Sequence, residues 1–371
     1  MPNEFRSRFF EELLRDCYSF QERNTDYSCF PASRFDRLKR KLKDRALALL
    51  SARGFGRRID DVAGVAHALL ATVSRLDELE RTYNLLEDDH SRRTFLDLLR
   101  YKILGPRHVK LPLNDSRFWA EYDSVDARFL KERRTLKAFW GWNLHLYEPE
   151  EGLRLHCNHA GILNTFRLEQ YAYRREGQSI SARDGDVVID GGGCTGDTTL
   201  YFAARVGSKG RVYTFEFEQR NLEIMDKNLA LNPHISASVE IVQRALWGES
   251  DEALDYDPNG PATTVALKQE PGTAQAMTLS IDDLVEREGL AKVDFIKMDI
   301  EGAELRALKG AERTMRAFRP TLAISAYHRE EDLVDIPAYI DGLDLGYEFL
   351  LDHFTIYHAE TVLFARTQNM T

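Results

Sequence analysis

The segment 187–196 constrains the fold of this chain more than any other stretch of its sequence. It reads Val-Val-Ile-Asp-Gly-Gly-Gly-Cys-Thr-Gly, so three branched apolar residues lead into an acid and a glycine-rich turn. A helix-compatible stretch, residues 197–205, follows directly. A buried strand, a tight glycine turn and a helix start together let the backbone approach a nucleotide-like ligand closely. The segment therefore predicts an α/β domain with a ligand site at the turn.

The acid before the glycines, Asp190, indicates the charge of that ligand. A dinucleotide-binding loop presents backbone N–H groups to a pyrophosphate, and a carboxylate at this point would repel the phosphates. A carboxylate suits a ligand with positive charge and no phosphate, such as S-adenosylmethionine with its ammonium and sulfonium groups. We therefore predict an S-adenosylmethionine site made by Asp190 and the turn glycines Gly191, Gly192, Gly193 and Gly196.

Two other interpretations of the turn stay open. Gly191, Gly193 and Gly196 also satisfy the pattern G-x-G-x-x-G. Glu216 then lies 20 residues beyond the last glycine, where a nicotinamide-dependent oxidoreductase places its ribose-binding acid. Alternatively, the chain could be a non-catalytic cofactor-binding module whose helical half mediates assembly. Cys194 is interpreted as a small residue that fits a tight loop rather than as a nucleophile.

Length and composition restrict the classes of protein to which this chain can belong. A chain of 371 residues exceeds what one core usually fills, so we expect two domains. The net charge of −10 argues against a dedicated nucleic-acid partner. The first residues lack the apolar core of a signal peptide, and no run approaches 18 apolar residues. Together with four cysteines that form no C-x-x-C pair, this predicts a cytoplasmic protein without membrane insertion.

The spacing of apolar residues changes along the chain. Residues 1–150 are predicted to form a mainly α-helical N-terminal extension, which could make a homodimer interface or cover an acceptor cleft; its predicted helices are 5–20, 33–52, 59–88 and 91–104. Residues 151–371 alternate strands with helices, which predicts a doubly wound, mostly parallel sheet. The predicted strands are 187–189, 211–215, 239–244, 295–298, 321–325, 348–352 and 361–365. The predicted helices are 219–231, 281–288, 303–317 and 333–342. A short connection between the last two strands predicts an antiparallel edge.

Further cofactor contacts are predicted at the ends of two strands. Glu216 follows the apolar residues 212–215, and a carboxylate there can accept both ribose hydroxyls of an adenosine. Alternatively, Glu216 is only an acid that is stabilised by the dipole of the helix that follows. Gln243, Ala245 and Leu246 come just after the next strand and are candidates to line the adenine.

A second pair of acids follows strand 295–298. Asp299 and Glu301 lie at the carboxyl edge of the predicted sheet, where open α/β folds bind their ligands. Beside a sulfonium they could stabilise the cofactor, orient an acceptor hydroxyl, or hold a divalent metal such as Mg²⁺. Alternatively, Glu301 caps the helix that follows. We expect Lys297 to pack its stem on the sheet or to pair with a carboxylate.

These motifs resemble the FkbM-type S-adenosylmethionine-dependent methyltransferases. The stretches 294–305 and 307–311 are similar to that family's signature, and with 190–196 they anchor a resemblance over about residues 180–366. Gly193-Cys194 stands where the family has Ala-Asn, and Glu216-Phe217 where it has Glu-Pro. The resemblance implies a class I methyltransferase (Rossmann-like) fold. It also implies O-methyl transfer to a sugar hydroxyl of a surface glycan or a glycosylated small molecule.

A sugar hydroxyl is a poor nucleophile at neutral pH and needs a base or a metal nearby. His328 follows the predicted strand 321–325 and is the candidate base, beside Asp299 and Glu301 as the other catalytic candidates. His328 could instead make only a structural hydrogen bond. Aromatic and histidine side chains that could contact a sugar acceptor, or belong to the core, are Trp119, Trp140, Trp142, His156 and His159.

Overall fold

The computed structural model describes residues 4–19, 62–137, 143–256, 265–266 and 274–367. The predicted helix 33–52 and the side chains of Trp140 and Trp142 lie outside this part of the chain. The described residues divide into two compact units. One contains the residues up to Trp119 together with Leu351–Thr361, and the other contains Ala120–Leu350 and the residues from Val362 onward.

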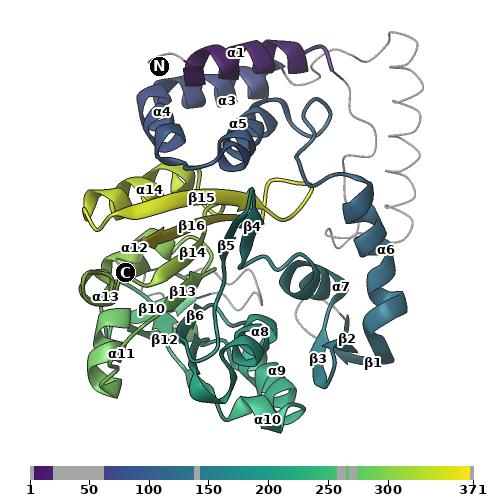
Figure 1. Ribbon diagram of the computed structural model, residues 1–371, viewed down its shortest axis with the longest axis vertical. Helices are drawn as coiled ribbons and strands as arrows, with labels where there is room; N and C mark the ends of the chain where they lie inside the picture. Colours follow the sequence, from purple (N-terminus) through teal and green to yellow (C-terminus); the bar gives the residue numbers. More distant parts are fainter. Residues whose placement is uncertain (1–3, 20–61, 138–142, 257–264, 267–273, 368–371) are drawn as a thin grey trace. The chain divides into compact units, whose positions relative to one another are not determined.

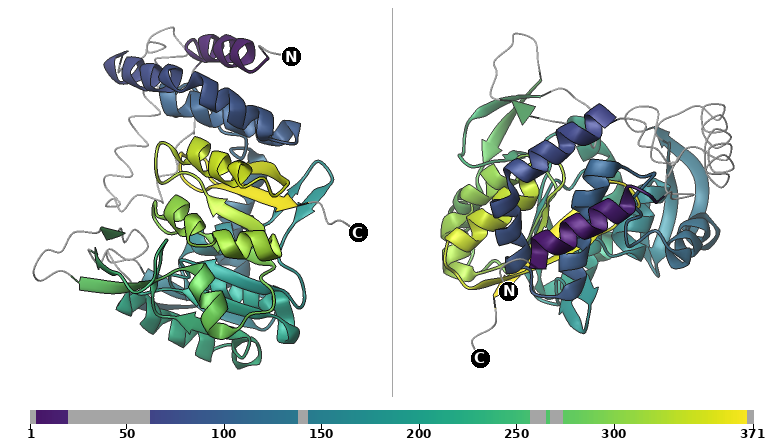
Figure 2. Two further views of the ribbon diagram at one scale, coloured as in Figure 1. Left: turned by 90° about the vertical axis from the view of Figure 1, so that its left-hand side faces the viewer. Right: turned by 90° about the horizontal axis from the view of Figure 1, so that it is seen from above.

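The first unit is built on helices, as the sequence predicts. They are α1 (Glu4–Asp16), α3 (Val62–Ser74), α4 (Leu76–Leu85) and α5 (Asp89–Leu104). Aromatic side chains from three of them pack together: the ring of Phe5 lies 5.2 Å from that of Tyr83 and 6.4 Å from that of Phe95. Asp88 caps α5 by accepting from the Ser91 N–H, and the helix ends at Gly105, where φ is 73°. Figure 2 shows the stack of these helices in two views.

The second unit contains a seven-stranded sheet in the order β15-β16-β14-β13-β6-β7-β8. Five strands are parallel neighbours, and β16 runs antiparallel to β14. This confirms the predicted mostly parallel sheet with an antiparallel edge. The strands are β6 (Val187–Gly191), β7 (Arg211–Phe215), β8 (Val239–Val242), β13 (Phe295–Met298), β14 (Thr321–Ser325), β15 (Tyr347–His353) and β16 (Thr361–Thr367).

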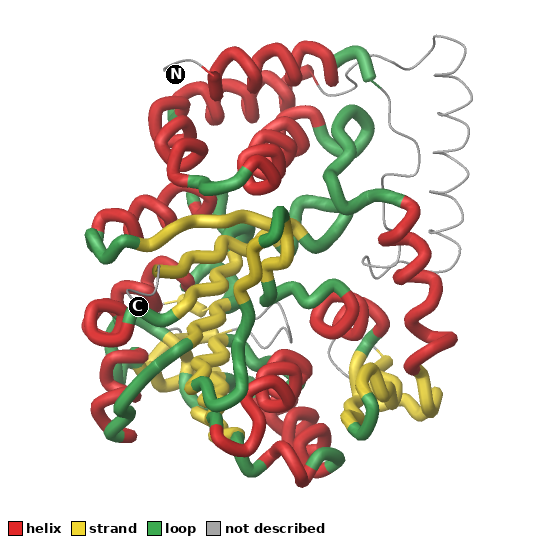
Figure 3. Tube along the Cα trace, viewed as in Figure 1, coloured by secondary structure: helices red, strands yellow, loops and turns green. Residues whose placement is uncertain are grey.

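Helices cover this sheet on both sides, as the red and yellow segments of Figure 3 show. On one side lie α8 (Asp197–Val206), α9 (Gln219–Ala230) and α10 (Pro233–Ser236); on the other lie α11 (Ile281–Glu288), α12 (Glu304–Lys309) and α13 (Glu312–Phe318) (Figure 1). α14 (Asp332–Gly342) joins β14 to β15. The helix predicted over 303–317 is divided near Gly310, where the carbonyl oxygens of Trp247 and Gly248 would lie within 2.6 Å of an added Cβ. The backbone of another segment packs there, so the helix does not continue through that point.

Short elements surround the large sheet, and the sequence patterns did not predict their strands. They are α6 (Ser116–Phe129), β1 (Leu130–Lys137), β2 (Asn143–Glu150), β3 (Leu153–Cys157), α7 (His159–Gly161), a π-helix (Ile162–Arg167), β4 (Tyr173–Arg175), β5 (Gln178–Ile180), a 3₁₀ turn (Gly207–Lys209), β9 (Ala245–Leu246), β10 (Ala253–Tyr256), β11 (Val265–Ala266) and β12 (Ala274–Leu279). No helix in the described ranges has both the length and the apolar character to cross a membrane.

The sequence places a domain boundary at residue 150, whereas the structure groups residues 120–150 with the second unit. The reason is the three-stranded sheet β1-β2-β3. Its strand β3 is fixed to α9 and to the residue before α10 by two asparagines: Asn228 Oδ1 accepts from the His156 N–H at 2.7 Å, and Asn232 Oδ1 accepts from the Arg154 N–H at 2.9 Å. Because β2 pairs with β3, the strands before residue 150 belong to the sheet-containing unit.

Candidate functional site

A cleft opens at the carboxyl ends of the central parallel strands of the second unit. It is lined by Gly192, Cys194, Phe215, Glu216, Phe217, Asn221, Arg244, Ala245, Leu246, Asp299, Ile300, Glu301 and Ala303. Six of the predicted site residues are in this set: Gly192, Glu216, Ala245, Leu246, Asp299 and Glu301. Three lining residues carry a carboxylate and one, Arg244, carries a fixed positive charge. The cleft wall therefore has acidic character.

The glycine turn after β6 is packed so closely that side chains are excluded at its first three residues. At Gly192, φ is +79° and an added Cβ would lie 2.0 Å from the carbonyl oxygen of Asp299. At Gly193 an added Cβ would lie 2.1 Å from Thr214 Oγ1, and at Gly191 it would lie 2.7 Å from the Leu246 side chain. Gly196, at φ +88°, precedes α8. Gly192 alone of the four lines the cleft, and the others shape the turn beneath it.

Asp190, predicted to contact the cofactor, does not line the cleft. Its side chain is fully buried below the turn, where the Lys297 ammonium lies 3.0 Å from Oδ1. The hydroxyls of three threonines also donate to this carboxylate: Thr198, Thr199 and Thr214. A buried charge needs such compensation, and these donors enclose both oxygens. Asp190 therefore positions the turn from below, and a direct contact with the cofactor stays a prediction.

Lys297 links this ion pair to the turn itself. Its ammonium donates to the carbonyl oxygens of Gly191 at 2.9 Å and Gly192 at 2.8 Å. Burial acts to lower the pKa of Lys297, but the charges of Asp190 and Asp299 outweigh it and raise the pKa above its ordinary value. The side chain is therefore a permanent cation that holds the turn from below. Lys297 pairs with a carboxylate, as the sequence led us to expect.

Glu216 follows β7 and faces the cleft. Its Oε1 accepts from the N–H groups of Phe217 and Glu218, each at 2.7 Å, and its Oε2 accepts from the Asn221 amide at 3.2 Å. Burial raises the pKa of Glu216 to about 7, although these hydrogen bonds act in the opposite direction. Asp190 is paired with the Lys297 ammonium. In the ion pairs of the described residues no cation is paired with Glu216, so the two carboxylates have different electrostatic environments.

The segment after β8 contributes apolar surface to the cleft. Ala245 and Leu246 are buried there, as predicted, whereas Gln243 is exposed and is not among the lining residues. Its neighbour Arg244 lines the cleft instead. The strand has ended at Val242, so alternation along a strand does not determine which of these side chains faces inward. Phe217 packs edge-on against Tyr256 with ring centroids 5.0 Å apart.

Asp299 occupies the cleft wall at the end of β13 and is held by a residue that the sequence did not single out. The Tyr171 hydroxyl donates to Asp299 Oδ2 at 2.7 Å, and the ring of Tyr171 lies 5.1 Å from the Lys297 ammonium. Burial alone would raise the pKa of Asp299, but the positive charges of His328 and Lys297 bring it below its ordinary value. Asp299 is therefore ionised at neutral pH. No sequence pattern relates Tyr171 to a residue 128 positions away.

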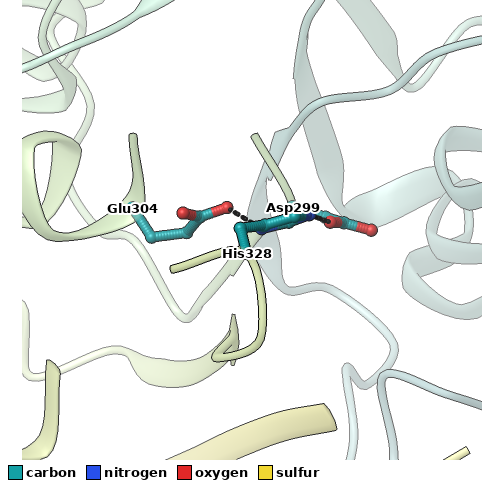
Figure 4. A group of neighbouring side chains, drawn as sticks. All are labelled: Asp299, Glu304 and His328. Atoms are coloured by element: carbon teal, nitrogen blue, oxygen red, sulfur yellow. Dashed lines mark ion pairs between the residues drawn. The ribbon is translucent and has the colours of Figure 1, made fainter. Parts of the chain in front are cut away.

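His328 lies among three carboxylates, as Figure 4 shows for two of them. Its Nδ1 is 2.9 Å from Glu304 Oε1, and its Nε2 is 3.4 Å from Asp299 Oδ1 and 3.5 Å from Glu301 Oε2. Burial lowers the pKa of His328, but Glu304 and the charges of Asp299 and Glu301 outweigh it and raise the pKa to about 10. An imidazole that already carries this proton cannot take another, which disfavours the predicted role of His328 as a base; that role stays a prediction.

The other candidates have partners elsewhere. His159 Nε2 lies 2.8 Å from the Tyr122 carbonyl oxygen, and Trp119 Nε1 donates to Asn114 Oδ1 at 2.8 Å. His156 Nδ1 is 3.3 Å from Asn228 Oδ1. None of these three residues lines the cleft. Cys194 does line it, and burial raises the pKa of this thiol well above its ordinary value, which disfavours a nucleophilic thiolate.

Comparison with known proteins agrees with this architecture. Residues 182–349 match the family model of the methyltransferase FkbM domain. A solved structure, the methyltransferase FkbM from Methylobacillus flagellatus KT, is similar with a TM-score of 0.52 and 21% sequence identity. The similarity covers 80% of this chain and 60% of that one, so this chain spans less than two thirds of its length. The fold of the sheet-containing unit is that of class I methyltransferases, as the sequence predicted.

Fibrillarin from Aeropyrum pernix, solved with bound S-adenosyl-L-methionine, has a TM-score of 0.36 and 12% identity; the similarity covers 64% of this chain and 99% of that one. No curated protein sequence matches the chain significantly.

Proposed function

Because residues 182–349 match the family model of the methyltransferase FkbM domain, we propose that this chain is an S-adenosylmethionine-dependent O-methyltransferase. The proposed acceptor is a hydroxyl of a sugar, carried by a glycosylated small molecule or a surface glycan. The observation that carries the proposal is the cleft, in which a side-chain-free turn at Gly192 and the carboxylates of Glu216, Asp299 and Glu301 surround one space. Such a wall suits a cationic adenosine derivative and disfavours a pyrophosphate.

The cofactor would use three parts of this wall. Glu216 Oε1 accepts from two N–H groups and Oε2 from the Asn221 amide, so one lone pair of Oε2 remains to accept a ribose hydroxyl. Ala245 and Leu246 offer buried apolar surface for the adenine. Gly192 lets the ligand approach the backbone. The sulfonium would then lie near acidic groups, and Coulomb attraction in a partly buried cleft favours a cation there.

Methyl transfer itself is an in-line displacement. The acceptor oxygen forms a bond to the methyl carbon while the bond from that carbon to sulfur breaks, and S-adenosylhomocysteine leaves with the electron pair. The hydroxyl proton must go to a base, and Asp299 and Glu301 are the carboxylates on the cleft wall that could accept it. His328, as a cation, balances their charge. Most of the catalysis would come from alignment, because the cofactor is already activated.

The first test is calorimetric titration of the full chain with S-adenosylhomocysteine, with NAD and NADP as parallel ligands. We expect micromolar affinity for S-adenosylhomocysteine and no heat from the nicotinamide nucleotides. Nicotinamide binding would instead support an oxidoreductase, and no binding of any ligand would support a non-catalytic module. A positive result justifies assays of methyl transfer to glycosylated acceptors, in which transfer only to non-hydroxyl groups would refute O-methylation.

A matched pair of glycine variants tests where the ligand binds. Gly192 and Gly185 both have positive φ, but an added Cβ lies 2.0 Å from Asp299 O at the first and 4.0 Å from Lys209 Cβ at the second. G192A should weaken S-adenosylhomocysteine binding at least tenfold, because the turn must move. G185A carries only the backbone strain and should bind as the natural protein does. Equal affinities in both variants would place the ligand away from the turn.

A further inference from the structure

Tyr171 reaches the cleft wall from a part of the chain that precedes the matched FkbM domain, which begins at residue 182. Its side chain is buried, and its hydroxyl donates to Asp299 Oδ2 at 2.7 Å. The amide of Gln170 donates to the same hydroxyl at 3.2 Å, so the phenol proton is directed at the carboxylate. The ring lies 5.1 Å from the Lys297 ammonium, within the range of a cation–π contact. Tyr171 therefore contacts both charged groups at the end of β13.

In the described part of the chain, the hydrogen bond from Tyr171 is the shortest side-chain contact of Asp299. At the other oxygen, Oδ1, the Tyr327 hydroxyl and His328 Nε2 are each 3.4 Å away. Contacts of this length are weak, so the bond at Oδ2 determines how the carboxylate is turned. The Asp299 side chain is 23% exposed and lines the cleft, so a ligand can reach it.

The turn beside Asp299 indicates which ligand group this carboxylate meets. An added Cβ at Gly192 would lie 2.0 Å from the carbonyl oxygen of Asp299, so the bare backbone of the turn and the carboxylate border the same part of the cleft. An ammonium can donate hydrogen bonds to an oriented carboxylate, whereas a sulfonium cannot. We propose that Tyr171 is a positioning residue for the cofactor, which holds Asp299 in the orientation that binds the ammonium group of S-adenosylmethionine. This role of Tyr171 rests on the proposed function, because that function supplies the cofactor.

The surroundings of Asp299 keep its carboxylate ionised. Burial acts to raise the pKa of Asp299, but the positive charges of His328 and Lys297 and the hydrogen bond from Tyr171 bring it below its ordinary value. A carboxylate held in this way is a weak base and a good partner for a cation. Of the two acids that could accept the proton of the acceptor hydroxyl, Glu301 is then the one that remains for that step.

The segment that carries Tyr171 is fastened to α8, the helix that begins directly after the glycine turn. Glu169 has a φ of 50°, which a non-glycine residue keeps only where its contacts hold it there. Its Oε1 accepts from Arg205 of α8 at 3.1 Å. The Thr165 hydroxyl donates at 3.0 Å to Oδ2 of Asp197, the first residue of α8. Tyr171 and the turn therefore share one support, which is the condition for holding a binding group within about 0.5 Å of its place.

The test is calorimetric titration of the full chain with two ligands that share the adenosine and the sulfur. S-adenosylhomocysteine has the amino-acid part with its ammonium, and 5′-methylthioadenosine lacks it. Y171F should weaken the binding of S-adenosylhomocysteine about tenfold, the effect of one hydrogen bond to a charged group, and leave the affinity for 5′-methylthioadenosine unchanged. A variant that merely loosened the cleft would weaken the binding of both ligands.

Y147F is the matched control, because Tyr147 is also buried and its hydroxyl also donates to a carboxylate, Asp126 Oδ1, at 2.7 Å. Neither residue lines the cleft, so Y147F should bind both ligands as the natural chain does. D299N should show the same selective loss as Y171F. In Y171F/D299N the second substitution should add no more than about a twofold loss, because the effect of Tyr171 passes through Asp299.

The results separate the role of Tyr171 from the proposed function. If the natural chain binds S-adenosylhomocysteine but Y171F weakens both ligands alike, or neither, the role of Tyr171 is overturned and the cofactor site stands. If the natural chain does not bind S-adenosylhomocysteine, the proposed function fails and the role of Tyr171 fails with it. Thermal melting checks that each variant is folded. Should Y171F not fold, Q170M decides, because it keeps the phenol and removes the amide that donates to it. A selective loss of S-adenosylhomocysteine binding in Q170M supports the role of Tyr171, and its absence overturns that role.

Discussion

Asp190 and Glu216 are acids at the ends of neighbouring parallel strands, and the structure gives them opposite environments. Asp190 lies within β6, opposite Thr214 in the register, whereas Glu216 comes one residue after β7 has ended. Asp190 is enclosed by one ammonium and three hydroxyls. Among the described residues, Glu216 is held by amide N–H groups, and it faces the cleft. The same residue chemistry therefore makes a compensated buried charge at one strand end and part of the cleft wall at the next.

The difference comes from where each strand stops. A side chain inside a central strand of a sheet covered on both faces is buried, so a carboxylate there must be neutralised within the protein. A side chain one residue past the strand is at the open edge, where the crevice of an α/β sheet forms. The acid after the strand therefore lines the cleft, whereas the acid within the strand is enclosed by the protein.

The largest expected effect comes from removing the charge of the buried acid, Asp190. D190N leaves the Lys297 ammonium buried without its counter-charge, and loss of one partner of a buried ion pair costs about 3–5 kcal/mol. The free energy of unfolding, measured by denaturant titration of the full chain, should fall by about that amount. S-adenosylhomocysteine binding should also weaken, because Lys297 holds the carbonyls of the turn.

A second substitution checks that charge is the cause. In D190N/K297M both charges are removed and the methionine keeps most of the buried stem, so the double variant should recover part of the lost stability. If D190N unfolds at the same denaturant concentration as the natural chain, the carboxylate does not compensate Lys297. If the double variant is less stable than D190N, the threonines rather than the ion pair hold this site.

Much of the fold could be predicted from the sequence because its signals are local. Apolar runs at 187–189 and 295–298 mark buried strands, and glycine turns and apolar spacing mark the helices beside them. The strands of the small sheets are less regular: β1 reads Leu-Lys-Glu-Arg-Arg-Thr-Leu-Lys, without alternation. Their pairing, rather than their own pattern, makes them strands.

The candidate site could be predicted only in part, because its geometry depends on contacts between distant segments. The acids Glu216, Asp299 and Glu301 follow strands and were found for that reason. Tyr171 and Glu304 were not found as partners, although they hold Asp299 and His328. Likewise, the protonation of His328 follows from three carboxylates that only the fold brings together. Sequence patterns identify strand ends, but they do not show which charges meet there.

The next effect concerns the cleft-facing acid. E216Q should weaken S-adenosylhomocysteine binding by about 1–3 kcal/mol, because the amide nitrogen that replaces Oε2 cannot accept a ribose hydroxyl. The free energy of unfolding should change little, since the amide oxygen still accepts from Phe217 and Glu218. E240Q is the control, because it makes the same change at an exposed position of β8. Unchanged affinity in E216Q would remove Glu216 from the cofactor site, and equal losses in both variants would indicate a long-range charge effect.

The smallest expected effect is a dependence on pH that distinguishes Glu216 from Asp190. Burial raises the pKa of Glu216 to about 7, so the ligand-free protein holds a proton there below that pH. A ribose hydroxyl donates to the ionised form, so affinity for S-adenosylhomocysteine should rise from pH 6 to pH 8, by no more than tenfold per pH unit. The folded pKa lies above the ordinary value of 4.5, so this group's contribution to stability is complete below pH 4.5 and is lost as the pH rises through 7.

Glu216 therefore makes two opposite slopes over the same range: stability of the ligand-free chain falls with pH while ligand affinity rises. Melting temperatures and calorimetric affinities measured at several pH values between 6 and 8 test both. E216Q has no proton to lose and should reduce both slopes, whereas D190N should lower stability at every pH and leave the slopes in place. If the slope of affinity with pH survives in E216Q, another titrating group binds the ligand, and the contrast between the two strand ends would lie in burial alone.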